Sequence, residues 1–339
     1  MIFCGAPFSV CRLHCANIYS MIIIDSLGGV DLELLYWLES IRTPVLDAFF
    51  STITHLGAEL VFMVLAVVLY WCIDKAEGLY LLSVGALGTT LNQFLKLAFR
   101  IPRPWVKDPN FTIVETARAD ATGYSFPSGH TQSVTGVFGA LARDSRKQWF
   151  RMLCIILIAL TAFSRMYLGV HTPMDMGVSL LLGTVLVFAL YPLKKKMEDR
   201  PETALWLLGV LAAINAAYWC YAAFFPFPAD SDAAQIAHGV ENGAKLTGAL
   251  IGMSLGCLID IKVVRSSVKA PILGQILKVF LGLAGVLAIK EGMRFLPDSV
   301  RYGLMTFFAA GIWPMAFPLF QKCGKKMSDD TTSNDRRCS

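Results

Sequence analysis

Long apolar runs separated by short polar segments fill most of the sequence. Each run has roughly 15 to 23 residues, the length of helix that crosses the hydrocarbon of a bilayer. Backbone polar groups in hydrocarbon must be paired within their own segment, so such runs predict transmembrane helices. The runs lie near 56–73, 77–99, 129–145, 149–168, 173–192, 204–225, 243–260, 271–290 and 302–320. We therefore expect an all-α polytopic membrane bundle of about nine transmembrane helices.

The third run is short and starts with polar side chains. These are Thr131, Gln132, Ser133 and Thr135. Hydroxyl and amide groups have no partners in lipid, so this helix is expected to be enclosed by the others.

Composition agrees with a membrane protein and excludes several other classes. Hydrophobic residues make up 55% of the chain and charged residues 16%, more apolar surface than a soluble core could cover. The nine cysteines are scattered, and the Cys11-x3-Cys15 pair lacks the partners of a zinc site. There is no Walker loop, no nucleic-acid motif and no cluster suited to a metal, so we expect neither a cofactor nor a metal.

Basic residues gather in alternate loops. One set of loops and the tail carry Arg143, Arg146, Lys147, Lys194, Lys195, Lys196, Arg200, Lys262, Arg265, Lys269, Lys322, Lys325 and Lys326. Because cytoplasmic loops are enriched in Lys and Arg, this set is predicted to be cytoplasmic. The 226–242 loop on the other side is acidic, which fits this orientation.

Three short blocks interrupt the apolar pattern with charged side chains. They are Lys96-x6-Arg103-Pro104, Pro127-Ser128-Gly129-His130 and Ser164-Arg165-x5-His171-x3-Asp175. Lys96, Arg103 and Arg165 are cationic donors, and a guanidinium fork matches two phosphate oxygens at once. All three blocks fall at span ends opposite the basic loops. The site should therefore open on the non-cytoplasmic face, to the periplasm, the cell exterior or an organelle lumen, and the cell (inner) membrane is the expected location.

The second block has the features of a helix N-terminus that binds an anion. Ser128 directly precedes an apolar stretch and is predicted to be the N-cap, which leaves the first-turn N–H groups facing a phosphate. Gly129 allows close approach of the backbone. His130, on the same turn, can protonate a leaving oxygen as a general acid.

His171 is the better candidate for a nucleophile. If Thr172 and Pro173 open a helix as N-cap and N1, the carboxylate of Asp175 folds back towards the imidazole. Such a contact fixes the tautomer and raises nucleophilicity, as in a catalytic triad.

Single histidines or arginines at membrane helix ends are more often capping or snorkelling residues than catalysts. Three ordered blocks together favour a site. His14, His55 and His238 belong to no block, and we assign them no role.

The three blocks resemble the signature of the type-2 phosphatidic acid phosphatase and vanadium haloperoxidase superfamily, in order and spacing. The resemblance is tight over about 56–192 and places the chain in the membrane phosphatase branch, with its lipid phosphate, sphingosine-phosphate and glucose-6-phosphatase-like members. It implies a phosphohistidine at His171, with His130 as acid. It also implies a set of phosphate ligands: Lys96, Arg103, Ser128, Gly129 and Arg165.

The chain divides into five expected segments. Residues 1–30 are ambiguous, because Met21 could be the true start; 31–55, divided by Pro44, predicts interfacial helices that guide a lipid or simply cap the bundle. Residues 56–225 form the phosphatase core and 226–320 an additional transmembrane module whose glycines allow close helix packing. The tail 321–339 is polar and expected to be disordered.

We expect a metal-independent enzyme that hydrolyses a lipid phosphate monoester or diphosphate. A phosphatase of soluble sugar phosphates would use the same site, and a transporter or scaffold with a vestigial site is a third reading, disfavoured by the intact blocks. The expected partners are a lipid phosphate and the bilayer, without nucleic acid. The sequence does not determine the substrate or the oligomeric state.

Overall fold

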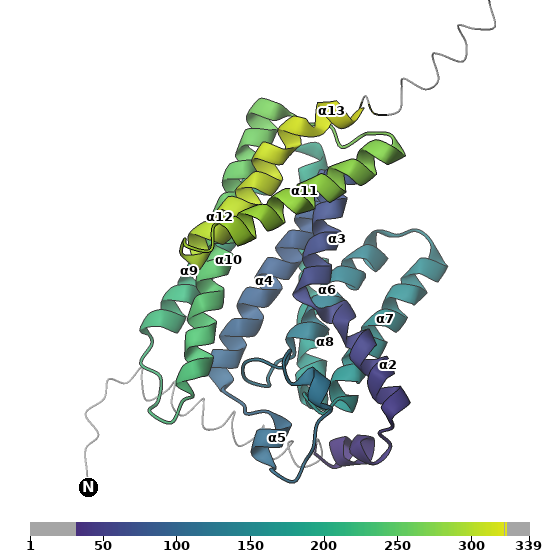
Figure 1. Ribbon diagram of the computed structural model, residues 1–339, viewed down its shortest axis with the longest axis vertical. Coiled ribbons are helices and arrows are strands. Elements are labelled where there is room, and N and C mark those ends of the chain that lie inside the picture. The colour runs from purple at the N-terminus through teal and green to yellow at the C-terminus, as the bar shows by residue number, and fades with distance from the viewer. Residues whose placement is uncertain (1–31, 322, 324–339) are drawn as a thin grey trace, which may run out of the picture.

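The computed structural model describes residues 32–321 and 323, and the regular structure in this part of the chain is entirely helical, without a β-strand. The expected all-α fold is confirmed (Figure 1). After a helical stretch at 32–40 come α2 (Pro44–Thr54), η1 (His55–Gly57), α3 (Glu59–Cys72), α4 (Lys75–Phe99), α5 (Pro104–Lys107), η2 (Glu115–Ala117), α6 (Gly129–Asp144), α7 (Gln148–Tyr167), α8 (Pro173–Asp199), α9 (Thr203–Phe224), α10 (Ala233–Ile259), η3 (Asp260–Val264), α11 (Ile272–Gly292), α12 (Asp298–Phe307), η4 (Phe308–Ile312), η5 (Trp313–Ala316) and α13 (Phe317–Gln321). The predictions for residues 1–30 and for the tail beyond 323 concern residues that lie outside the described part of the chain.

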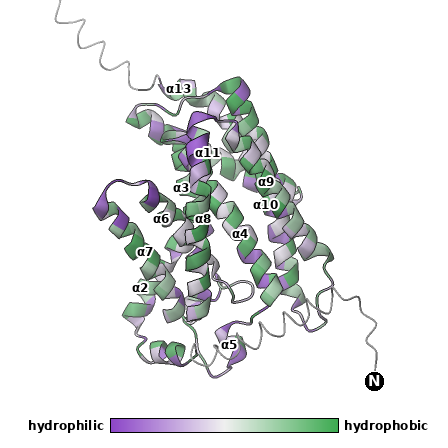
Figure 2. Cartoon of the chain, turned by 180° about the vertical axis from the view of Figure 1, so that it is seen from behind, coloured by the Kyte–Doolittle hydropathy of each residue, from purple (hydrophilic) through white to green (hydrophobic). Residues whose placement is uncertain are grey.

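Fewer helices qualify as membrane spans than the nine apolar runs suggested. Within the described residues six helices are long and apolar enough, or seven if α2 with η1 and α3, which are bent by 46°, count as one broken span. Each predicted run does lie on a helix, but α6 has only 16 residues and α4 carries charged and amide side chains near both ends. Figure 2 shows mostly hydrophobic residues along the long helices and hydrophilic ones around α5 and the α6–α7 connection.

Helix α4 lies at the centre and packs against α3, α6, α8 and α9. Two of its glycines make this possible. A Cβ at Gly85 would lie 1.9 Å from the ring of Phe62 on α3, and one at Gly88 would lie 1.8 Å from the amide of Gln132 on α6. Three of the four polar residues that open α6, Thr131, Gln132 and Thr135, are buried, so this helix is enclosed as expected.

Two buried polar clusters tie the bundle together. On α9, the Asn215 amide accepts from the Thr90 hydroxyl at 2.9 Å and donates to the Gly243 carbonyl (2.9 Å) and Thr247 Oγ1 (2.7 Å) on α10. At the end of the bundle away from α5, Lys194 pairs with carboxylates from α4, α6 and α8, which are Glu77, Asp144 and Glu198.

The C-terminal helices pack closely through glycine, as the sequence predicted. A Cβ at Gly248 would lie 1.8 Å from the carbonyl oxygen of Ser299, and one at Gly252 would lie 1.9 Å from that of Gly303. Helices α10 and α12 therefore touch backbone to backbone. The interfacial position expected for 31–55 remains a prediction.

Candidate active site

The three charged blocks meet at the end of the bundle that carries α5. Lys96 lies in the last turn of α4, Arg103 directly precedes α5, His130 is the second residue of α6 and His171 lies just before α8. These four side chains and Gly129 line one cavity of about 210 Å³, called here the site cavity. The other predicted site residues, Ser128, Arg165 and Asp175, lie fully buried around it rather than among the residues that line it.

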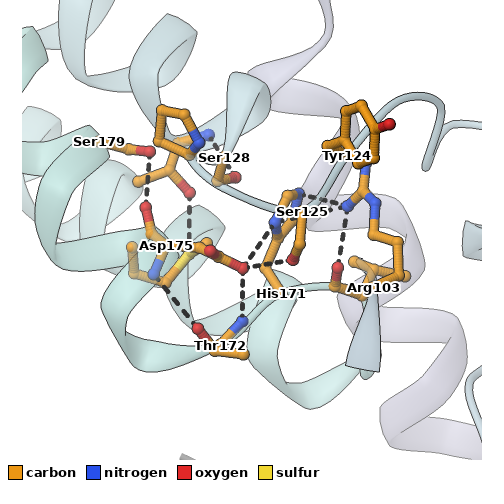
Figure 3. A network of polar contacts seen from close by, with 12 residues as sticks. Arg103, Tyr124, Ser125, Ser128, His171, Thr172, Asp175 and Ser179 are labelled. Atoms are coloured by element: carbon orange, nitrogen blue, oxygen red, sulfur yellow. Dashed lines mark hydrogen bonds and ion pairs between the residues drawn. The ribbon is translucent and has the colours of Figure 1, made fainter. Parts of the chain in front are cut away.

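The start of α8 orients His171. Thr172 is the N-cap and Pro173 the first helical residue, and Thr172 forms a capping box with Asp175, as predicted. Oδ2 of Asp175 accepts from the Thr172 N–H at 2.9 Å and lies 3.2 Å from Nδ1 of His171. Figure 3 shows the imidazole lying between Asp175 and Arg103. A short local motif therefore places a carboxylate behind the ring.

The contact with Arg103 defines the tautomer of His171. Nη1 of Arg103 lies 2.8 Å from Nε2 of the imidazole. A guanidinium can only donate, so Nε2 must carry the lone pair and Nδ1 the proton, which it donates to Asp175. Burial, with the charge of Arg103, holds the pKa of His171 well below its ordinary value, so the ring is neutral at neutral pH. Nε2 is thus unprotonated and accepts from Arg103.

Arg103 is held by three backbone carbonyls. Its Nε donates to Gly123 at 3.0 Å, its Nη1 to Val170 at 2.9 Å and its Nη2 to Thr122 at 2.7 Å. Gly123 has a φ of +75°, which few other residues adopt, and this turns its carbonyl towards the guanidinium. Burial lowers the pKa of Arg103 to about 10, so it stays charged. Most of its fork is occupied by the protein, which fixes the cation beside His171.

Arg165 and His130 have donor or acceptor atoms without partners among the described residues. Arg165 is fully buried; its Nη1 donates to Thr54 Oγ1 at 2.8 Å, while Nε and Nη2 contact no acceptor. Nε2 of His130 is also buried and unpaired. Buried polar atoms are normally paired because an unpaired one keeps its full desolvation cost. An anion in the site cavity would supply the missing acceptors.

The N-terminus of α6 keeps space open above its first turn. Ser128 is the N-cap and accepts from the Thr131 N–H, as predicted. A Cβ at Gly129 would meet only Asn92 Oδ1, at 3.9 Å, so any side chain there would extend into the site cavity. Lys96 is buried in the wall and donates to the Tyr124 carbonyl at 2.5 Å.

Sequence reasoning missed several residues at this site. Ser125 donates to Oδ2 of Asp175 at 2.6 Å, which gives this carboxylate oxygen a third partner. His238, to which we assigned no role, lines the site cavity with Asn242, and both lie on α10. Ser125 is three residues before Ser128, but no motif distinguishes it from other loop serines. The α10 residues carry no local signal at all, since only the tertiary fold brings them here.

The charge of the site cavity is mainly positive near His171. Lys96 and Arg103 line it and Arg165 lies behind it. Within the residues that the structure describes, no group of three or more His, Cys, Asp or Glu side chains is arranged to hold a metal ion.

Known proteins are similar in sequence to this chain over most of its length. The sequence model of the PAP2 superfamily matches residues 77–198, and that of "PAP2 superfamily phosphatase, transmembrane extension" matches 244–325. The "Probable sphingosine-1-phosphate phosphatase" of Dictyostelium discoideum is 26% identical over 311 residues, which cover 85% of this chain and 73% of that protein.

Two further relatives come from a bacterium and a mammal. Undecaprenyl-diphosphatase BcrC of Bacillus subtilis is 30% identical over 154 residues, 44% of this chain and 76% of the relative. Sphingosine-1-phosphate phosphatase 1 of Rattus norvegicus is 25% identical over 260 residues, 71% of this chain and 58% of the relative. With the family signature gathered in one cavity, these matches show that the chain belongs to the PAP2 superfamily, in its branch of membrane lipid phosphate phosphatases.

Proposed function

We propose that this protein hydrolyses a lipid phosphate through a phosphohistidine formed on Nε2 of His171. The observation that supports the proposal is the position of the His171 imidazole, which is fixed between Asp175 and Arg103. Its Nδ1 donates to Asp175, its Nε2 lone pair accepts from the Arg103 cation, and the residue lines the site cavity. The sphingosine-1-phosphate phosphatases among the relatives favour a sphingoid base phosphate as the lipid.

In the first step Nε2 of His171 leaves its contact with Arg103 and attacks phosphorus. The bond from phosphorus to the lipid oxygen breaks, and His130 donates a proton to that oxygen, releasing the alcohol. Lys96, Arg103 and Arg165 balance the negative charge that the phosphoryl oxygens carry throughout. Asp175 stabilises the positive charge that grows on the imidazole as its Nε2 bonds to phosphorus.

In the second step water attacks phosphorus on the opposite side from His171. His130, now neutral, takes a proton from this water, the bond to Nε2 breaks, and inorganic phosphate leaves. The three cations occupy the place that a divalent metal has in many phosphoryl-transfer sites, so we propose a reaction without a metal.

The chain crosses the membrane nine times in this proposal, with α4 and α6 shielded from lipid by their neighbours. The site cavity opens on the non-cytoplasmic face of the cell membrane. Support comes from the charges at the other end, where Arg143 lies near the end of α6, Lys147 in the α6–α7 connection and Lys195 near the end of α8.

The orientation predicts opposite labelling of two exposed positions. Asn110, between α5 and η2, should face outside, and Glu198, near the end of α8, should face the cytoplasm. In intact cells, with the native cysteines replaced, Asn110→Cys should react with an impermeant maleimide and Glu198→Cys should react only after permeabilisation. Labelling of Glu198→Cys alone in intact cells would reverse the orientation.

Phosphate release by the purified protein in one detergent tests the function. We expect kcat/KM to be at least about tenfold higher for a sphingoid base phosphate, phosphatidate or a polyprenyl diphosphate than for glucose 6-phosphate. A lipid presents its headgroup at the membrane surface, where this cavity lies, and its chains stay in hydrocarbon. Release should persist in EDTA and stop with orthovanadate, which mimics five-coordinate phosphorus. If glucose 6-phosphate matches every lipid, the sugar phosphatase reading replaces this one; dependence on added magnesium would overturn the metal-free mechanism.

A further inference from the structure

A carboxylate lines the same cavity as the phosphate-binding cations. Glu59 is the first residue of α3, is accessible to solvent, and makes no hydrogen bond or ion pair with the other described residues. Lys245 is close enough to interact electrostatically with Glu59, but its ammonium pairs with Glu241 at 2.5 Å and Asp298 at 3.3 Å instead. A carboxylate repels a phosphate dianion. Phosphate binding therefore does not explain why a carboxylate lines the cavity at position 59.

A second side chain of the cavity also lacks partners. Gln132 is 1% exposed, and neither its Oε1 nor its Nε2 has a hydrogen-bond partner among the described residues. Its amide rests directly against Gly88 of α4. Nearly all buried amides are paired in native proteins. A bound group that both donates and accepts would satisfy this one.

The helix register brings these two residues to the same level. Helices α3 and α4 are consecutive and antiparallel, and a Cβ at Gly78 would lie 2.5 Å from the Tyr70 backbone nitrogen. Glu59 lies eleven residues before Tyr70 on α3, and Thr89 lies eleven residues after Gly78 on α4, so the antiparallel helices bring Glu59 level with Thr89. Thr89 follows Gly88, which contacts the amide of Gln132. Thr89 also lines the site cavity. Glu59 and Gln132 therefore share one end of it.

This end adjoins the oxygen that leaves in the proposed reaction. A Cβ at Gly57, two residues before Glu59, would lie 2.9 Å from the Cβ of His130. Because His130 protonates the leaving oxygen, the carbons attached to that oxygen lie on its side of the cavity. Polar groups on those first carbons would reach Glu59 and Gln132.

We propose that Glu59 and Gln132 form a subsite for an ammonium group and a neighbouring hydroxyl on the carbons next to the phosphate. The subsite rests on the proposed function and specifies its substrate as a 2-amino alcohol phosphate, the headgroup of a sphingoid base phosphate. The ammonium neutralises Glu59, and the hydroxyl can both donate to and accept from Gln132. A diacyl glycerol phosphate offers only ester acceptors there and leaves Glu59 without a cation.

The test compares a sphingoid base phosphate with its N-acylated form, in which the ammonium becomes a neutral amide. The wild-type protein should prefer the free amine by about tenfold or more in kcat/KM, because a site built around a polar group rejects an analogue that lacks it. Glu59→Gln should lower kcat/KM about tenfold for the free amine and leave the N-acylated substrate unchanged, so the preference should disappear. Glu115→Gln, an exposed glutamate paired with Arg118 outside the cavity, is the matched control and should change neither value.

The outcomes separate the subsite from the function. Hydrolysis of both substrates with no amine preference, or an equal loss for both in Glu59→Gln, would overturn the subsite and leave the phosphatase intact. If the wild type releases phosphate from neither substrate and from no other lipid phosphate, the proposed function itself fails. An unchanged melting temperature in Glu59→Gln ensures that a loss reflects recognition.

Discussion

Replacing His171 by alanine should reduce phosphate release by on the order of 10⁴-fold or more, the scale seen when other enzymes lose a nucleophile. His171→Ala removes the atom that bonds to phosphorus, while the cations that bind the substrate remain. Wild-type protein quenched in alkali during turnover of a labelled substrate should retain acid-labile phosphate, as expected of a phosphohistidine. His171→Ala should retain none.

His130→Ala is the informative partner for this variant. A nitrophenolate leaves without being protonated, so His130→Ala should still form the labelled intermediate from nitrophenyl phosphate while failing with a lipid phosphate. Should His171→Ala turn over at the wild-type rate, or should label appear on it, another residue is the nucleophile. Both variants must keep the wild-type melting temperature for the comparison to hold.

Changing Asp175 to asparagine should lower kcat by about 10²- to 10³-fold, with a smaller effect on KM. The amide is nearly the same shape, and its oxygen can take the place of Oδ2, where it still accepts from the Thr172 N–H and from Nδ1 of His171. The negative charge behind the ring is lost, however, so the positive charge that grows on the imidazole as Nε2 bonds to phosphorus is no longer stabilised.

Ser125→Ala is the control for Asp175→Asn. It removes the 2.6 Å hydrogen bond to Asp175 but leaves the two other partners of that oxygen and the charge in place. A loss of about tenfold or less in kcat is expected. Activity of Asp175→Asn within tenfold of the wild type would show that the charge of this carboxylate does not assist His171.

The local part of the site was predictable because short sequences determine it. Thr172-Pro173 followed by Asp175 is a helix-start signal, and the same signal folds the carboxylate towards His171. Ser128 before an apolar run is likewise an N-cap. Arg103 was expected to bind two phosphate oxygens with its guanidinium fork, but three backbone carbonyls from the folded loops occupy most of that fork. No sequence pattern encodes those contacts.

The rest of the site depends on which helices meet. Glu59 and Gln132 come together through the packing of α3 and α6 on α4, and His238 arrives with α10, far along the chain. Hydropathy also overestimates the number of clear spans. It detects apolar runs but cannot tell whether a helix such as α6 faces lipid or is surrounded by protein.

The Asn215 cluster has a consequence for biogenesis. Thr90 and Asn215 precede α10 in the chain, yet the amide donates to Gly243 and Thr247 on that helix. Until α10 docks, the NH₂ group of Asn215 lacks its acceptors and the wall containing His238 and Asn242 is missing. The last-made helices thus complete both the polar core and the cavity, so a nascent chain arrested after α9 holds every signature residue and still lacks a finished enzyme.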